Sequence, residues 1–177
     1  MKDKPLPDIL KPNLDIVFIG FNPGLQSAKE RHHYAGKSNR FWRFLYESGL
    51  TPVKLEPQED IRLLEFGYGS TNIVDRETKS AAEITEEEYA IGRENLKKIL
   101  IAYKPKVACY VGMGIYKKFA GVKHVALGLQ KESVVEGVMD YICSSTSGLN
   151  SKPFDEQIDC FRGLVDLLKR IKQEKIE

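Results

Sequence analysis

One loop of the sequence gathers the side chains best suited to chemistry. It begins at Asn22 with Asn-Pro-Gly and ends in two histidines and Tyr34. A carboxamide can orient a water molecule through hydrogen bonds, but it cannot take up a proton as a strong general base. Taken alone, Asn22 is more typical of a turn, because Asn-Pro favours that geometry. If the loop is catalytic, we expect slow hydrolysis in which binding and positioning supply much of the acceleration.

Motifs of several other chemistries are incomplete. Gly112-Met113-Gly114 follows a strand pattern, but Lys117 stands where a dinucleotide-binding fingerprint needs glycine. Gly36-Lys37-Ser38 resembles the end of a phosphate-binding loop, but Arg31 occupies the place of its first glycine. The sequence therefore disfavours an enzyme that holds the phosphate of a small molecule in a glycine-rich turn.

The elements that must position the loop alternate between strand and helix patterns. Apolar runs typical of buried parallel strands occur at 15–20, 68–74, 106–112 and 138–143. Helices are predicted after Ser38-Asn39 with Gly49 as a stop, after the Thr85/Glu88 capping box as far as Pro105, from Gly114 to Phe119, and from about Phe154 onward. This order predicts a three-layer α/β/α domain with a central four-stranded, mostly parallel sheet. We expect one domain over residues 1–177, with residues 1–13 as an extended arm.

The predicted topology also locates the site. Parallel sheets place their ligands at the carboxyl ends of the strands. Here those ends lead into three loops, at 22–37, 75–79 and 144–152. A further charged loop is predicted at 52–60.

Several short blocks, taken in order, carry more information than any one of them. They are Gly20-Phe21-Asn22-Pro23-Gly24-Leu25, His32-His33-Tyr34, Asn39-Arg40-Phe41-Trp42, Thr71-Asn72-Ile73-Val74-Asp75-Arg76 and Ser144-Ser145-Thr146-Ser147-Gly148-Leu149. Together they resemble the mismatch-specific uracil-DNA glycosylase and thymine-DNA glycosylase family, over roughly residues 14 to 170. The resemblance implies a four-stranded parallel sheet between helices, which agrees with the pattern of strands and helices.

The resemblance implies roles for residues of the first loop. Asn22 would position the attacking water, and His33 would lie near the base or its leaving oxygen. Tyr34 would stack on the flipped pyrimidine, and Ser27 would lie near the C5 edge of that base. The remaining predicted contacts to the base come from Gly20, Phe21, Pro23, Gly24 and Asn39. Backbone N–H groups of the Gly20–Leu25 turn could stabilise negative charge on the departing pyrimidine.

The last predicted loop is the one that would enter DNA. The resemblance implies that Gly148 and Leu149 fill the gap left by the flipped base and touch the widowed guanine. An apolar wedge of this kind holds a base stack open. The predicted DNA-binding residues are Ser147, Gly148, Leu149, Asn150 and Lys152.

Structural roles compete with several of these interpretations. His33 could make only a structural hydrogen bond, Asn39 could only cap its helix, and Leu149 could only anchor its loop. Phe41 and Trp42 are expected in the core, and Arg76 in a salt bridge. The function has an alternative as well, a non-catalytic module on the same fold that binds DNA mismatches or nucleotides.

Composition limits the setting in which the protein works. The net charge of +2 neither requires nor excludes a nucleic acid, because binding needs only a local basic patch. No apolar run is long enough to span a membrane, and the N-terminus lacks the apolar stretch of a signal peptide. Three scattered cysteines suit packing in a reducing compartment. We expect an intracellular protein. The resemblance further implies a monomer that acts without metal or organic cofactor on double-stranded DNA containing a mismatched or damaged pyrimidine.

Overall fold

The computed structural model describes residues 4–176 and contains one sheet of five strands in the order β2-β1-β3-β5-β4. The first four of these strands run parallel to one another, and β4 is an antiparallel edge strand. The strands are β1 (Ile16–Gly20), β2 (Tyr68–Asn72), β3 (Val107–Val111), β4 (Gly128–Leu129) and β5 (Met139–Cys143). The predicted four-stranded sheet is therefore confirmed in its parallel part and extended by β4.

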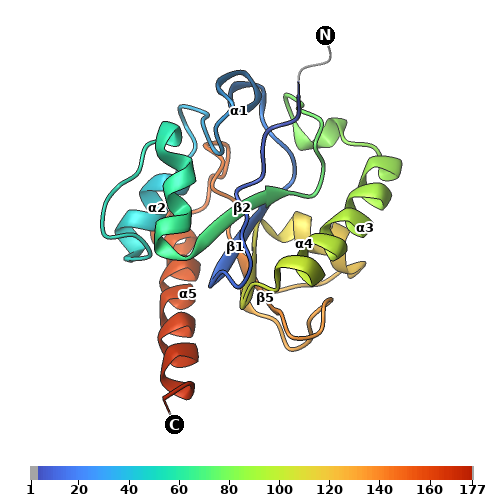
Figure 1. Cartoon of the computed structure of the whole chain (residues 1–177). Coiled ribbons are helices and arrows are strands. Elements are labelled where there is room, and N and C mark those ends of the chain that lie inside the picture. Colours follow the sequence, from blue (N-terminus) through green and yellow to red (C-terminus); the bar gives the residue numbers. More distant parts are fainter. Residues whose placement is uncertain (1–3, 177) are drawn as a thin grey trace.

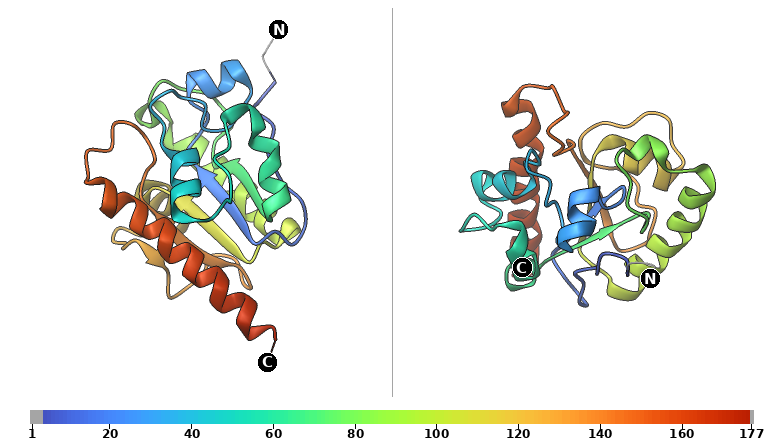
Figure 2. Two further views of the ribbon diagram at one scale, coloured as in Figure 1. Left: turned by 90° about the vertical axis from the view of Figure 1, so that its left-hand side faces the viewer. Right: turned by 90° about the horizontal axis from the view of Figure 1, so that it is seen from above.

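Helices cover both faces of the sheet, so the three-layer α/β/α prediction is confirmed (Figure 1). The helices are α1 (Leu25–Glu30), α2 (Phe41–Ser48), α3 (Glu86–Tyr103), α4 (Met113–Ala120) and α5 (Phe154–Glu174). Two 3₁₀ helices, η1 (Pro57–Phe66) and η2 (Ala81–Glu83), complete the set. Figure 2 shows that α5, the longest helix, runs along one face, while α3 and α4 lie on the other. Within residues 4–176, no helix is both long and apolar enough to cross a membrane.

The two faces bury separate cores because successive strand residues point to opposite sides. In β1, Ile16 and Phe18 pack with α2 and α5, whereas Val17 and Ile19 pack with α3 and α4. The strands are buried on both faces, which explains why they appear in the sequence as continuous apolar runs. The cysteines Cys109, Cys143 and Cys160 are buried and free, in agreement with the packing role expected for them.

Two short helices lie in segments predicted as loops. Helix α1 occupies part of the predicted 22–37 loop, and only Ser27 of its six residues is buried, so no apolar stripe marks it. Helix η1 begins inside the predicted 52–60 loop, where Glu56 and Glu59 form a capping box. Both loop predictions were wrong at these positions because short helices fixed by capping and tertiary contacts lack hydrophobic periodicity.

The N-terminal arm lies against the edge of the sheet. The backbone of Ile9 exchanges two hydrogen bonds of 2.9 Å with Ser70 of β2 and forms an antiparallel bridge. Its side chain is buried in the core. The arm thus continues the sheet beyond β2 and brings residues 4–8 toward the carboxyl ends of the strands.

Candidate active site

The carboxyl ends of all four parallel strands border one cavity of about 400 Å³. Gly20, Asn72 and Val111 end three of the strands, and residues 145–148 follow the fourth. This is the position where ligands bind in sheets of this kind. Among residues 4–176, no Asp or Glu lines the cavity, and the one lysine that does is Lys79. The site is therefore suited to a polar ligand without positive charge, such as a nucleobase.

Asn22 is held in one orientation by two acceptors. Its Nδ2 lies 2.7 Å from the backbone oxygen of Arg76 and 2.8 Å from Oγ1 of Thr78. The Thr78 hydroxyl donates its own proton to the backbone oxygen of Ser80 at 2.8 Å, so it accepts from Asn22. Both amide hydrogens are thus used, and Oδ1 has no partner among the described residues. That oxygen is an acceptor available to a water molecule in the cavity.

Tyr34 lines the same cavity. Its ring stacks on Phe41, with ring centroids 3.8 Å apart and planes 14° apart. The backbone of Tyr34 has a φ of 52°, in the left-handed region that bulky residues rarely adopt. Such strain costs about 1–3 kcal/mol and persists only where surrounding contacts impose it. The surrounding contacts thus hold Tyr34 beside the cavity in a strained backbone conformation.

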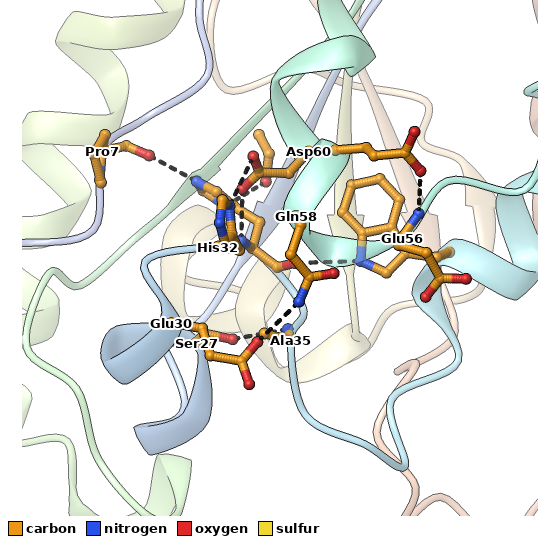
Figure 3. Close-up of polar contacts among 12 residues, drawn as sticks. Pro7, Ser27, Glu30, His32, Ala35, Glu56, Gln58 and Asp60 are labelled. Atoms are coloured by element: carbon orange, nitrogen blue, oxygen red, sulfur yellow. Dashed lines mark hydrogen bonds and ion pairs between the residues drawn. The ribbon is translucent and has the colours of Figure 1, made fainter.

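Four hydrogen bonds hold the backbone on both sides of Tyr34 (Figure 3). Asp60 of η1 accepts from the backbone N–H of His33 at 2.9 Å, and the Trp42 indole donates to the backbone oxygen of His33 at 3.2 Å. Ser27 accepts from the N–H of Ala35 through Oγ at 3.0 Å, and from His32 through its backbone oxygen at 3.2 Å. Ser27 also lines the cavity, so its predicted place near the base is compatible with this role.

His33 is buried, with only 3% of its surface exposed, and both ring nitrogens have protein partners. Nε2 lies 2.7 Å from the backbone oxygen of Pro7, which can only accept, so Nε2 carries the proton. Nδ1 then accepts from the Ser70 hydroxyl at 2.8 Å. Burial lowers the pKa of His33 and keeps the ring neutral. This geometry matches the structural alternative, and the contact of His33 with a base stays a prediction.

This burial makes stability depend on pH. Because the folded-state pKa of His33 lies below the ordinary value of 6.5, the unfolded chain binds a proton that the folded chain does not. The free energy of unfolding should therefore fall as the pH drops below about 6.5, by at most about 1.4 kcal/mol per pH unit from this group. Chemical denaturation between pH 5 and 7.5 measures the slope.

The matched variants separate His33 from other groups. In His33→Gln the amide can still donate to Pro7, and this part of the slope should disappear. His124→Gln, at an exposed histidine, should keep the wild-type slope. An unchanged slope in His33→Gln would show that His33 titrates alike in both states.

Gly20 and Asn72 form the end of the cavity next to the sheet. A Cβ atom on Gly20 would lie 2.5 Å from Oδ1 of Asn72 and 3.5 Å from the hydroxyl of Tyr34. Any side chain there would displace Asn72, so the glycine is needed for this close approach. Asn72 was missing from the predicted site residues, although it ends a strand inside a block that carried the resemblance. Its carboxamide can donate to and accept from the edge of a base.

The other predicted contacts to the base lie around the cavity. Phe21, Pro23, Gly24 and Asn39 all line it. The backbone oxygen of Pro23 accepts from Thr78 at 3.3 Å, and Gly24 forms a parallel bridge with the same residue. Asn39 accepts from the N–H of Phe41, the first residue of α2, at 3.0 Å, although Arg40 occupies the N-cap position of this helix. Their contacts with a base stay predictions.

The predicted DNA-entering loop is anchored at its base and exposed at its tip. Asn150 donates to Ser144 at 3.0 Å and to the backbone of Ser145 at 2.9 Å. Arg40 donates to the backbone oxygen of Asn150 at 3.2 Å. Leu149 is 94% exposed, so it does not anchor the loop. A Cβ on Gly148 would lie 2.5 Å from Ser38, which leaves glycine as the residue that fits there.

The rest of this loop closes one side of the cavity and borders a second one. Ser147 and Gly148 line the first cavity. Ser147, Leu149, Asn150 and Lys152 line the adjacent cavity of about 430 Å³. Their contacts with DNA stay predictions. The expected salt bridge of Arg76 is present, with Nε 2.5 Å from Glu88 of α3.

Comparison with known proteins places this fold and site in a class. A model of the uracil DNA glycosylase superfamily matches residues 7–169. The solution NMR structure of a candidate uracil DNA glycosylase from Methanosarcina acetivorans superposes with a TM-score of 0.60 at 19% sequence identity. That alignment covers 92% of this chain and 98% of the other, and it shows the shared fold.

The fold and the cavity thus define an α/β protein with a cavity of about 400 Å³ at the carboxyl edge of a parallel sheet. Because the family match spans nearly the whole sequence, the chain belongs to the uracil DNA glycosylase superfamily. Membership supports excision of uracil from DNA as its general activity.

Proposed function

We propose that the protein is a monofunctional DNA glycosylase that hydrolyses the N-glycosidic bond of uracil mispaired with guanine. Thymine and related pyrimidines are candidates for further substrates. The proposal rests mainly on the orientation of Asn22. Its Nδ2 is fixed by Arg76 and Thr78, and its Oδ1 is left for a water molecule in a cavity that Tyr34 also lines.

The residues around the cavity suit this reaction. A base must leave the duplex to reach the site, at a cost of a few kcal/mol, and stacking on an aromatic ring returns about 1–3 kcal/mol. The fixed ring of Tyr34 offers that surface. Asn72 can hydrogen-bond to the base, and Asn22 can orient the water that attacks the sugar. The carboxamide cannot take the proton fully, so we expect slow turnover.

Mismatch preference follows from the cost of flipping. A mispaired base leaves the duplex more easily than a paired one, which favours uracil opposite guanine. Leu149, at the tip of an anchored loop next to the cavity, can occupy the space that the base vacates. We place this loop in the duplex, with Gly148 and Leu149 at the widowed guanine.

The deciding experiment follows release of the base from labelled DNA. End-labelled duplexes with G·U, A·U, G·T or G·C would be incubated with the protein in the presence of a chelator, and hot alkali would reveal abasic sites. We expect breaks in the G·U strand only after alkali. No breaks in any uracil duplex at enzyme excess, despite binding, would favour the non-catalytic mismatch-binding module.

The same gel tests whether the enzyme is monofunctional. Lys79 lines the cavity, and a lysine amine can attack the sugar carbon and cleave the strand without alkali. We expect no such breaks and no borohydride-trapped complex with DNA. Alkali-independent breaks that disappear in Lys79→Gln would instead establish a lyase activity.

Contacts to phosphate should appear in the salt dependence of binding. Lys152 lies beside Leu149 in the second cavity, whose walls contain no acidic residue in the described part of the chain. In Lys152→Gln, the slope of log K against log salt should decrease by about 0.9 if the lysine neutralises one phosphate. Fluorescence anisotropy between 50 and 200 mM salt measures this slope. Lys169→Gln is the control, because Lys169 is exposed on α5 and lines neither cavity.

A further inference from the structure

The N-terminal arm contributes a side chain to the base cavity. Leu6 lies 16 positions before Asn22 in the sequence, yet both residues line the same cavity. Leu6 is half-buried there. It lies between Lys4, which is hydrogen-bonded to Arg31 at the end of α1, and Pro7, which is hydrogen-bonded to His33. The cavity is therefore completed by a segment outside the strand-end loops.

The backbone on both sides of Leu6 is fixed. Arg31 donates to the backbone oxygen of Lys4 at 3.0 Å. His33 donates to that of Pro7 at 2.7 Å, a bond that Figure 3 shows. Further along, Thr71 donates to the Asp8 carboxylate at 2.7 Å. With both flanks held, the backbone of Leu6 cannot leave the cavity wall without breaking one of these bonds.

The sheet edge is shaped to receive the arm. Ile9 is 4% exposed and pairs with Ser70 through two backbone hydrogen bonds. A Cβ on Gly69 would lie 2.4 Å from the backbone oxygen of Ile9, so the bare backbone of β2 allows this close contact. The buried ring of His33 joins the arm, through Pro7, to Ser70 on the same strand. The arm is thus a fixed part of the site.

We infer that Leu6 is a specificity-determining residue that limits the size of the base admitted to the cavity. The inference rests on the proposed glycosylase function. An aliphatic side chain makes no hydrogen bond, so Leu6 can select bases only by shape and apolar contact. A single methylene in such a pocket changes selectivity by about 10- to 200-fold.

The test compares rates for bases that extend the pyrimidine at different edges. Single-turnover excision of uracil, 5-bromouracil and ethenocytosine, each opposite guanine, would be measured for wild type, Leu6→Ala and Leu6→Phe. In Leu6→Ala, the rate for at least one of the two larger bases should rise about tenfold relative to uracil. In Leu6→Phe, the same ratio should fall. Pro5→Ala, at an exposed neighbour, should leave every ratio unchanged.

Rate ratios separate selectivity from damage to the fold. Loosening of the arm would slow all three bases together, and thermal unfolding would report it. Unchanged ratios in both Leu6 variants would overturn the inference while leaving the glycosylase function intact. If the wild type releases no base, the proposed function fails. The role of Leu6 in selectivity would then be tested by calorimetry, as the ratio of the affinities for free 5-bromouracil and free uracil in wild type and in the two Leu6 variants. An unchanged ratio would overturn the inference.

Discussion

Asn22→Ala should lower the single-turnover rate of uracil release from a G·U duplex by about 10²–10³-fold. One well-placed polar group in a water-excluding site is worth that much. The truncation removes Oδ1, which has no partner among the described residues, and also releases Arg76 and Thr78 from their shared donor. Duplex affinity should stay within a few-fold, because the predicted DNA contacts lie elsewhere.

Two comparisons show whether orientation of the carboxamide is the cause. Thr78→Ser keeps the hydroxyl that accepts from Asn22 and should retain most activity, whereas Thr78→Val should lose about tenfold because one amide hydrogen loses its acceptor. Asn95→Ala, at an exposed asparagine of α3, should behave as wild type. Full activity of Asn22→Ala would remove Asn22 from the mechanism.

The strands and long helices were predictable because burial leaves a pattern in the sequence. The four parallel strands are covered on both faces, and the capping box at Thr85 and Glu88 marks the start of α3. Strand β4 has two residues, and α1 buries one side chain, so neither produces a hydrophobic periodicity in the sequence. These elements depend on contacts made only after the chain has folded.

The site shows the same division between local and distant residues. Asn22 and Tyr34 belong to one loop, so their proximity to each other follows from the sequence. Asn72 reaches the cavity from a neighbouring strand, which the rule for strand ends could have indicated. Asp60 and Leu6 carried no such signal. Asp60 binds the backbone N–H of His33 through a buried carboxylate, and Leu6 lines the cavity from the docked arm. Both positions are consequences of tertiary packing.

His33 illustrates the limit of a family resemblance as a guide to chemistry. The resemblance implied that His33 lies near the base or its leaving oxygen, with a structural hydrogen bond as the alternative. In the structure, Nε2 of His33 is hydrogen-bonded to Pro7 of the arm and Nδ1 to Ser70 of β2. We therefore expect a change at His33 to alter activity through the position of Leu6 and Tyr34.

Leu149→Ala should slow uracil release from duplex DNA by about 10- to 100-fold and leave release from single-stranded DNA unchanged. Full burial of a leucine side chain contributes about 1.5–3 kcal/mol, and Leu149 would be buried in this way on entering the base stack beside a flipped nucleotide. At 94% exposure the side chain contributes little to the free protein, so the thermal unfolding temperature should not change. Single-turnover assays on both substrates measure the difference.

The comparison of substrates is what ties the effect to strand opening. Single-stranded uracil needs no wedge, so a loss on both substrates would indicate damage to the cavity and contradict the role in the duplex. Leu129→Ala is the matched control, since Leu129 is also exposed but lies on the edge strand β4. The hydrogen bonds of Asn150 and Arg40 fix the base of the loop. A fixed loop would lose little conformational entropy on entering DNA, so we expect one apolar side chain at its tip to be enough to hold a base pair open.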